Sequence, residues 1–228
     1  MTDLKETIRE IRVQLRRSMN GVVATSMRRQ GVLYKLNFGV SLLRLKEIAQ
    51  SYPPGKELAE ALWSEDIREF KILATLLYPV EQFTRETADR WVRDIRYQEI
   101  AEQYSHNLLK RHPQALAMAT DWVGEEGFVG VMGYLLFARL FEQQVVPPEL
   151  DVFFDQAVQD AVSDDFPTQR ATVVALKRFG RISEECARLV MQKLAPCNAS
   201  GDPVEAALYE DIKIEFDYYY LRTGMLNN

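Results

Sequence analysis

The chain has few of the residues that interrupt helices or cross-link a fold. Its 228 residues include 11 glycines, 9 prolines and 2 cysteines. So few glycines and prolines favour long helices over a β fold, whose many turns need both. The two cysteines, Cys186 and Cys197, cannot build a disulfide framework and are typical of the reduced thiols of a cytoplasmic protein.

Metal-binding patterns, catalytic motifs and membrane-spanning runs are also lacking. The only histidines are His106 and His112, and no spacing of His and Cys suggests a metal site. There is no Gly-rich phosphate loop, no nucleophile elbow and no Ser/His/Asp set. The most apolar run, residues 128–141, spans 14 residues and contains Arg139, whereas a transmembrane helix needs roughly 17 residues or more. The N-terminus is charged and helix-periodic, unlike a signal peptide, so we expect a cytoplasmic protein. From the lack of metal-binding patterns and of a membrane-spanning run, we expect no metal and no membrane partner.

Charge is distributed unevenly along the chain. The net charge is −5, yet residues 1–46 carry +7, residues 142–166 carry −7, residues 167–193 carry +4 and residues 202–217 carry −5. Such a field can present a basic face to a polyanion although the whole protein is acidic. Helix faces also segregate charge without any such partner, so charge alone leaves both interpretations open.

Hydrophobic periodicity predicts an all-α fold of about twelve helices. Leu4, Ile8, Ile11 and Leu15, for example, recur at three- and four-residue steps, which is typical of an amphipathic helix. We expect Ser41 and Ser64 to cap helices at their N-termini. The predicted helices cover residues 4–19, 42–52, 56–64, 64–79, 84–94, 98–112, 113–125, 128–144, 149–164, 167–179, 183–195 and 203–222, with Gly180 just past the end of its helix and with a short helix and a loop in residues 21–40.

These helices come in pairs, and the second members recur at a regular distance. Ala74, His106, Leu136 and Val174 lie near their middles, 32, 30 and 38 residues apart. A period of roughly 30–47 residues built from two helices is typical of an α-solenoid, in which neighbouring repeats bury one another. We therefore predict a single domain, residues 1–228, made of antiparallel helix pairs.

Several stretches resemble the DNA alkylation repair family of HEAT-like-repeat DNA glycosylases, the AlkD type. The resemblance rests on LWSEDIREFKILATLL (62–77), DRWVRDIRYQEIAEQ (89–103), ATDWVGEEGFVGVMGYLLFARL (119–140), QRATVVALKRFG (169–180) and YEDIKIEFDYYY (209–220), in the order of the family. It implies a HEAT-like α-solenoid whose concave basic groove holds duplex DNA. It also implies excision of N3- or N7-alkylated purines without metal or cofactor. Such a base is a cationic leaving group, so a carboxylate that stabilises the sugar suffices for the chemistry.

The resemblance also places functional residues, and this chain departs from it at three of them. Tyr97 takes the place of a lesion-facing tryptophan, but Ala101 stands where an aspartate is expected four residues later. If the chain cuts, Glu102 or Glu99 would have to supply the carboxylate, although both are also typical surface charges.

The other two departures lie further along the chain. Where the resemblance implies an arginine, this chain has Gly130 or Val131. Where it implies a second tryptophan, this chain has Val174. Gly127, Gly130 and Gly133 recur every three residues. On a helix, this spacing allows the close approach of another helix or of a ligand. Trp63 and Trp122 occupy positions that favour packing between repeats.

Basic residues in the same stretches are candidates for contacts with DNA phosphates, which need only cations at a suitable spacing. In the segment 89–112 the alternative is a solvated basic face, with Trp91, Val92 and Ile95 forming the buried side. Arg170, Lys177 and Arg181 line one side of a helix and its exit. The candidates are Lys71, Arg90, Arg93, Arg96, Lys110, Arg111, Arg170, Lys177, Arg178 and Arg181.

Three functions remain open from the sequence. The chain could bind duplex DNA and excise cationic alkylated purines. It could bind damaged or bent DNA without cutting it. It could also have lost both properties and serve as a HEAT-repeat scaffold for a protein partner.

Overall fold

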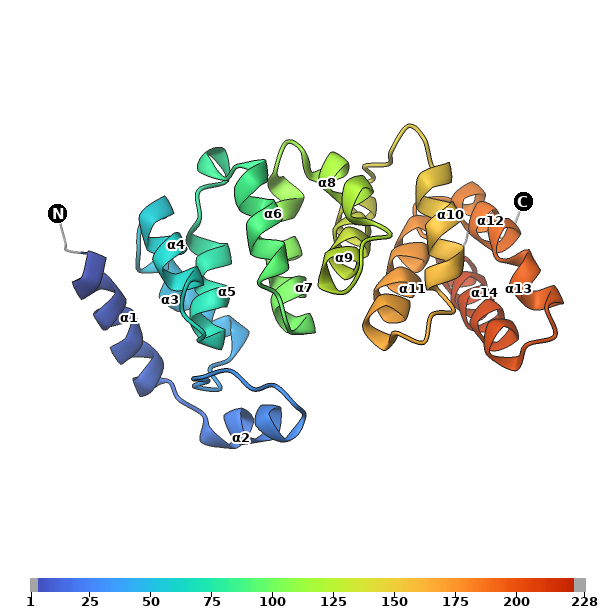
Figure 1. Ribbon diagram of the computed structural model, residues 1–228. Coiled ribbons are helices and arrows are strands. Elements are labelled where there is room, and N and C mark those ends of the chain that lie inside the picture. Colours follow the sequence, from blue (N-terminus) through green and yellow to red (C-terminus); the bar gives the residue numbers. More distant parts are fainter. Residues whose placement is uncertain (1–3, 224–228) are drawn as a thin grey trace. The chain divides into compact units, whose positions relative to one another are not determined.

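The computed structural model describes residues 4–223, with side chains to residue 220, and confirms the all-α prediction over that range (Figure 1). Between residues 4 and 223 the only β feature is one isolated parallel bridge, Leu36 with Ile67. The helices are α1 Leu4–Arg17, α2 Gly21–Arg29, α3 Leu42–Gln50, α4 Lys56–Trp63, α5 Arg68–Leu77, η1 Val80–Gln82, α6 Arg85–Arg93, α7 Gln98–Asn107, η2 Leu109–Arg111, α8 Ala115–Trp122, α9 Phe128–Glu142, α10 Asp151–Asp160, α11 Phe166–Gly180, α12 Glu184–Lys193, α13 Ala195–Ala199 and α14 Pro203–Thr223.

The chain divides into two compact units, Met1–His112 and Pro113–Asn228, which we call unit 1 and unit 2. Unit 1 holds α1 to α7 with both 3-10 helices, and unit 2 holds α8 to α14. The prediction of one domain over residues 1–228 stays a prediction. In the part of the chain that the structure describes, no helix combines the length and the apolar character that crossing a bilayer requires.

Side-chain caps set several helix starts. Six side chains accept a hydrogen bond from a backbone N–H three residues later and so satisfy one of the N–H groups that a helix start leaves open. They belong to Asn20, Ser41, Thr84, Asp165, Ser183 and Asp202. The predicted cap at Ser41 is confirmed. The one at Ser64 is wrong, because the Asp66 carbonyl oxygen and the Arg68 N–H are bonded to the backbone of Leu36, so that α5 begins at Arg68.

The core of unit 1 is built around stacked tryptophans. Trp63 of α4 and Trp91 of α6 lie with ring centroids 4.0 Å apart and an interplanar angle of 2°. Phe83 and Tyr104 pack their rings around Trp91. Trp63 is 3% exposed, as is Trp122 in unit 2, so the predicted core placement of both is confirmed.

Polar contacts between neighbouring segments of unit 1 repeat at nearly the predicted period. The bonded pairs are Phe38–Glu69, Trp63–Asp94, Arg68–Glu99 and Thr75–Asn107, with separations of 31, 31, 31 and 32 residues. Equivalent positions of successive repeats therefore face one another, as expected of a stacked helical repeat.

Unit 2 has its own aromatic core, in which glycines bring helices close together. Phe141 of α9, Phe153 of α10 and Phe179 of α11 pack against one another, with ring centroids 5.1 to 6.4 Å apart. A Cβ on Gly133 would lie 2.7 Å from the Val123 backbone nitrogen, so α9 approaches the end of α8 closely. The predicted role of this glycine in close helix packing is confirmed.

Gly180 differs from its predicted place. It is the last residue of α11 rather than a residue just beyond the helix. A Cβ there would lie 2.1 Å from the end of the Phe216 ring, which α14 contributes. Gly180 is therefore required by tertiary packing more than by the helix end itself.

Candidate nucleic-acid interface

A basic pocket of about 320 Å³ lies within unit 1. Its wall comes from the segment before α3, the connection from α4 to α5, and the connection from α6 to α7. The wall mixes aromatic rings with charges of both signs. It consists of Tyr34, Trp63, Ser64, Asp66, Lys71, Arg93, Asp94, Ile95, Arg96, Tyr97 and Ile100.

Lys71 is the half-buried cation of the basic pocket. Its Nζ donates to the Trp63 carbonyl oxygen at 2.6 Å and lies 4.5 Å from the centre of a Trp63 ring. Burial lowers the pKa of Lys71, against the opposing charges of Asp94 and Asp66. Asp94 is held in turn by the Trp63 indole N–H at 3.0 Å. Trp63 therefore holds the Lys71 ammonium in position at the wall of the basic pocket.

Two tyrosines form another part of the wall. The ring centroids of Tyr34 and Tyr97 lie 4.5 Å apart, and the Tyr97 hydroxyl accepts a hydrogen bond from Leu33 N at 2.9 Å. The Tyr34 hydroxyl is buried and has no hydrogen-bond partner in the described part of the chain. Burial, and then the charge of Glu99, raise the pKa of Tyr34. Tyr97, the residue predicted to face a lesion, thus lines the basic pocket and also bonds to the backbone N–H of Leu33.

Arg93 and Arg96 are the exposed cations of the basic pocket. Arg93 donates to the Asp89 carbonyl oxygen at 2.5 Å, and neither guanidinium forms an ion pair within residues 4–220. Arg90, one residue before the buried Trp91, behaves differently because both oxygens of Glu60 accept from it, at 2.7 and 2.6 Å. The predicted division of this segment into a buried apolar face and an exposed basic face is confirmed.

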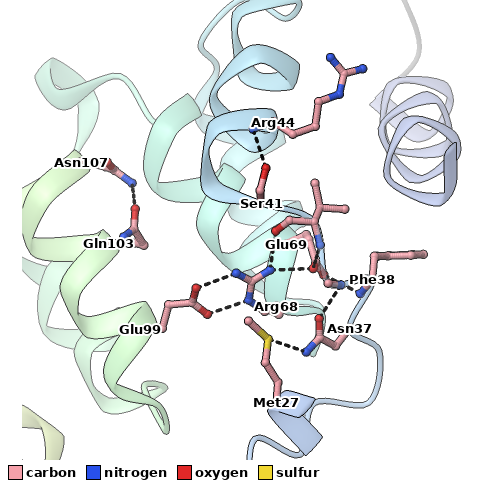
Figure 2. Close-up of polar contacts among 12 residues, drawn as sticks. Met27, Asn37, Phe38, Ser41, Arg44, Arg68, Glu69, Glu99, Gln103 and Asn107 are labelled. Carbon is pink, nitrogen blue, oxygen red and sulfur yellow. Dashed lines mark hydrogen bonds and ion pairs between the residues drawn. The ribbon is translucent and has the colours of Figure 1, made fainter. Parts of the chain in front are cut away.

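Glu99 is engaged in a buried ion network rather than free (Figure 2). Its two oxygens accept from Arg68 at 2.7 and 2.6 Å. Arg68, 2% exposed, also donates to Glu69 at 2.8 Å and to the Val40 carbonyl oxygen at 2.9 Å. Glu69 accepts the backbone N–H groups of Phe38 and Val40. We call Arg68, Glu69 and Glu99 the ion triad; it ties residues 38–40 to α5 and α7.

Glu102 is the less engaged of the two candidate carboxylates. It is half-buried on α7, and its Oε1 accepts from Gln98 at 3.3 Å. It does not line the basic pocket. Ala101, where the resemblance expects an aspartate, is fully buried.

Two further candidate cations of unit 1 lie away from the basic pocket, in η2. Lys110 Nζ lies 3.4 Å from His106 Nδ1, and Arg111 is exposed. The structure does not bring them together with Lys71, Arg93 and Arg96.

Most of the candidate cations of unit 2 have acidic partners. Lys177 bonds to Asp211 and Glu215 of α14 at 2.7 and 2.8 Å. Burial opposes the charged ammonium, but these two carboxylates outweigh it and raise the pKa of Lys177. Arg181 also pairs with Glu215.

The remaining two cations of unit 2 differ from each other. Arg178 pairs with Glu142 at 3.0 Å. Arg170 is exposed and forms no ion pair among the described residues. Unit 2 thus uses most of its candidate cations to join its own helices.

A model of the DNA alkylation repair enzyme family matches residues 11–198. The chain belongs to this family. A solved structure described as "a new family of proteins related to the HEAT-like repeat DNA glycosylases with affinity for branched DNA structures" has a TM-score of 0.73 and 14% identity, covering 85% of this chain and 83% of that chain. At such identity the likeness establishes the fold, and the predicted HEAT-like helical repeat is confirmed. A search of curated proteins gave no significant match.

For this member of the DNA alkylation repair family, the positions where the chain departs from the resemblance are packing positions. Val131 is 1% exposed, and a Cβ on Gly130 would lie 2.2 Å from the Glu125 carbonyl oxygen. Val174 is half-buried on α11. None of these side chains can donate, accept or carry charge. Among the described residues no cluster of His, Cys, Asp and Glu could hold a metal ion.

The charge of this family member is divided sharply between its two units. Residues 1–112 contain 19 Lys/Arg and 15 Asp/Glu, a net charge of +4, whereas residues 113–228 contain 9 and 18, a net charge of −9. The sequence shows the basic excess of residues 1–46, but the candidates for phosphate contacts do not include the individual arginines of residues 16–29. The pattern that indicates these arginines is the stretch of residues 11–46, which has eight Lys/Arg and no Asp/Glu.

Proposed function

We propose that this protein binds DNA through unit 1, by contacts between phosphates and the cations of the basic pocket, and that binding rather than base excision is its activity. The observation that carries the proposal is the pair Arg93 and Arg96, exposed beside Lys71 without an ion-pair partner among residues 4–220. A cation that is already paired with an acid must give up that pair to meet a phosphate. An unpaired cation loses no such ion pair, and its contact with a phosphate releases the counterions around both groups.

Branched DNA is the form that we propose it prefers. The solved structure with the same fold is described as having affinity for branched DNA structures. Where strands diverge, base faces are exposed that a continuous duplex keeps stacked. The half-buried rings of Tyr34 and Tyr97 in the basic pocket are suited to contact such faces beside cations.

Base excision has weaker support in the geometry. It needs a carboxylate beside the sugar, and both oxygens of Glu99 are bonded to Arg68. Glu102 accepts one side-chain hydrogen bond, from Gln98, and can accept more, but it lies outside the wall of the basic pocket. Glu102 is therefore the residue on which an excision activity would depend.

The first test is the double variant Arg93→Ala/Arg96→Ala, measured by fluorescence anisotropy with a three-way DNA junction and a linear duplex of matched sequence. We expect wild-type affinity to fall steeply between about 50 and 200 mM salt, since phosphate contacts release counterions. The variant should bind about tenfold more weakly, and its slope of log K against log salt should be smaller by about 2.

The control is Arg9→Ala/Arg90→Ala, which removes the same charge from exposed arginines that are paired with Glu6 and Glu60. It should bind nearly as wild type does. Release of 7-methylguanine from methylated duplex by the wild type, lost in Glu102→Gln, would contradict the proposal that binding is the activity. No affinity for either DNA would favour the protein-binding scaffold instead.

A further inference from the structure

The end of α1 and the whole of α2 carry four arginines that lie outside the basic pocket. Residues 16–29, which we call the basic arm, carry Arg16 and Arg17 in the last turn of α1 and Arg28 and Arg29 in the last turn of α2. All four are exposed, and none forms an ion pair among the described residues. They lie within the acid-free stretch of residues 11–46, so no neighbour in sequence neutralises them.

Helix α2 is well formed but has no buried residue. Its start is capped by Asn20, whose side chain accepts from Val23 N at 3.1 Å. The exposed fraction is 81% for Val22 and 62% for Met19. A nine-residue helix is marginal in water by itself, so other contacts must hold it in place. Val23, Ala24 and Met27 are half-buried on one side of α2 and no residue of the helix is fully buried, so apolar packing supports α2 on that side only.

What holds α2 is a backbone contact on one side. Asn20 N donates to the Phe38 carbonyl oxygen at 2.9 Å. Asn37 Nδ2 contacts Met27 Sδ at 3.3 Å (Figure 2). Gly39, at φ +68°, permits this approach, because a Cβ there would lie 2.2 Å from the Asn20 carbonyl oxygen. The arm is thus fixed along one edge while its arginines and Val22 face solvent.

The segment that holds the arm is itself anchored by the ion triad. Glu69 accepts both Phe38 N and Val40 N, and Arg68 joins Glu69 to Glu99 of α7 (Figure 2). Charged groups at 2% and 0% exposure are costly to bury unless they are paired and hydrogen-bonded, as they are here. The triad therefore anchors residues 38–40, the segment that the arm contacts.

From these observations we infer that the basic arm is a second DNA-contacting surface that recognises the branch point of branched DNA. Arg28 and Arg29, with Arg16 and Arg17, contact phosphates where strands converge. Val22 and Met19 pack against the base faces that a branch leaves unstacked, as apolar side chains do at disrupted base steps. This inference rests on the proposed function and extends it to a surface apart from the basic pocket.

An anionic membrane is a less suitable partner for the same surface. Membrane-bound amphipathic helices bury a broad apolar face among lipid chains. The arm offers mainly Val22 and Met19 on a helix of nine residues, beside four arginines. Charge complementarity without a broad apolar face favours the phosphates of a nucleic acid.

The charge of the arm is tested with full-length Arg28→Ala/Arg29→Ala, measured by anisotropy with the three-way junction. Affinity should fall about tenfold and the salt slope by about 2, since two phosphate contacts are lost. The control Arg9→Ala/Arg188→Ala removes the same charge from exposed arginines elsewhere and should bind as wild type. The urea unfolding midpoint of both variants should equal that of the wild type, which excludes a folding defect.

The apolar contact is tested separately with Met19→Ser/Val22→Ser. This variant keeps every arginine, so its affinity for the linear duplex should be unchanged. Its affinity for the junction should fall by about threefold to tenfold, because contacts with unstacked bases are lost.

Three outcomes would overturn the inference, and they separate it from the proposed function. If the arm variants bind like the control while Arg93→Ala/Arg96→Ala binds weakly, only the inference fails. If the wild type has no affinity for either DNA, the proposed function fails with it. If the arm variants lose binding to phosphatidylserine vesicles and keep DNA binding, the arm is a membrane-binding element.

Discussion

At the scale of single residues, the ion triad places two charged side chains, Arg68 and Glu69, in the interior of unit 1. Removing Arg68 would leave the buried carboxylate of Glu69 without a compensating charge. Arg68 is the centre of the triad, because Glu69 and Glu99 both bond to it. Glu69 also accepts two backbone N–H groups, so the triad satisfies donors of the 38–40 segment that are buried with it. We interpret the triad as a device for orientation more than for net stability.

Arg68→Met should therefore destabilise the protein by about 3–5 kcal/mol, the cost of leaving a buried charge uncompensated. The free energy of unfolding would be measured by urea denaturation with tryptophan fluorescence. Glu99→Gln should cost less, because the Glu99 side chain is 31% exposed and Arg68 keeps Glu69 as a partner. A variant Arg68→Met as stable as the wild type would show that apolar packing can replace the triad.

At the scale of secondary-structure elements, glycines decide which helices can touch. Gly133 admits the end of α8 against α9, and Gly180 admits Phe216 of α14 against α11. Ion pairs from Lys177 and Arg181 to Glu215 join the same two helices, α11 and α14. Close backbone approach and charge pairing thus act together at one helix contact.

Gly180→Ala should destabilise unit 2 by about 1–3 kcal/mol, because the added Cβ would overlap the Phe216 ring. Adding Phe216→Leu should recover part of the loss by shortening the obstructing side chain. Gly21→Ala is the matched control in unit 1: a Cβ there meets nothing within 4 Å, and alanine favours the helix by about 0.5–1 kcal/mol. Urea midpoints that move in the same direction for both variants would contradict this account.

At the scale of the whole molecule, net charge is a poor guide to the partner. The protein carries −5, but unit 1 alone carries +4 and unit 2 carries −9. Because salt screens charges beyond about 10 Å, a polyanion responds to the local field of unit 1. We therefore expect DNA to be held by unit 1 although the whole protein is acidic.

Hydrogen exchange of the full-length protein with and without the three-way junction would test this expectation. Exchange should slow in peptides that cover residues 16–29 and 93–97, where backbone and arginines meet DNA. Peptides of α11 and α14 should be unchanged, because Lys177 and Arg181 are paired within unit 2. Protection centred on α11 would instead move the interface to Arg170 and its neighbours.

The sequence by itself determined the helices, their pairing and the family. Helices follow from local periodicity, and caps such as Ser41 follow from contacts three residues apart. The order of the resembling stretches was sufficient to indicate the DNA alkylation repair family, which the family model then established. The failure at Ser64 has a non-local cause, since its helix start was displaced by pairing with Leu36.

Only the tertiary structure decided which charged side chains are available. Glu99 and Glu102 look alike in the sequence, yet Arg68, 31 residues before Glu99, bonds to both oxygens of that carboxylate. Lys177 and Arg93 look alike too, yet carboxylates 34 and 38 residues after Lys177 neutralise it, while Arg93 has no such partner among residues 4–220. Periodicity records which face of a helix is buried, but an ion pair depends on two side chains that only folding brings within about 3 Å of each other.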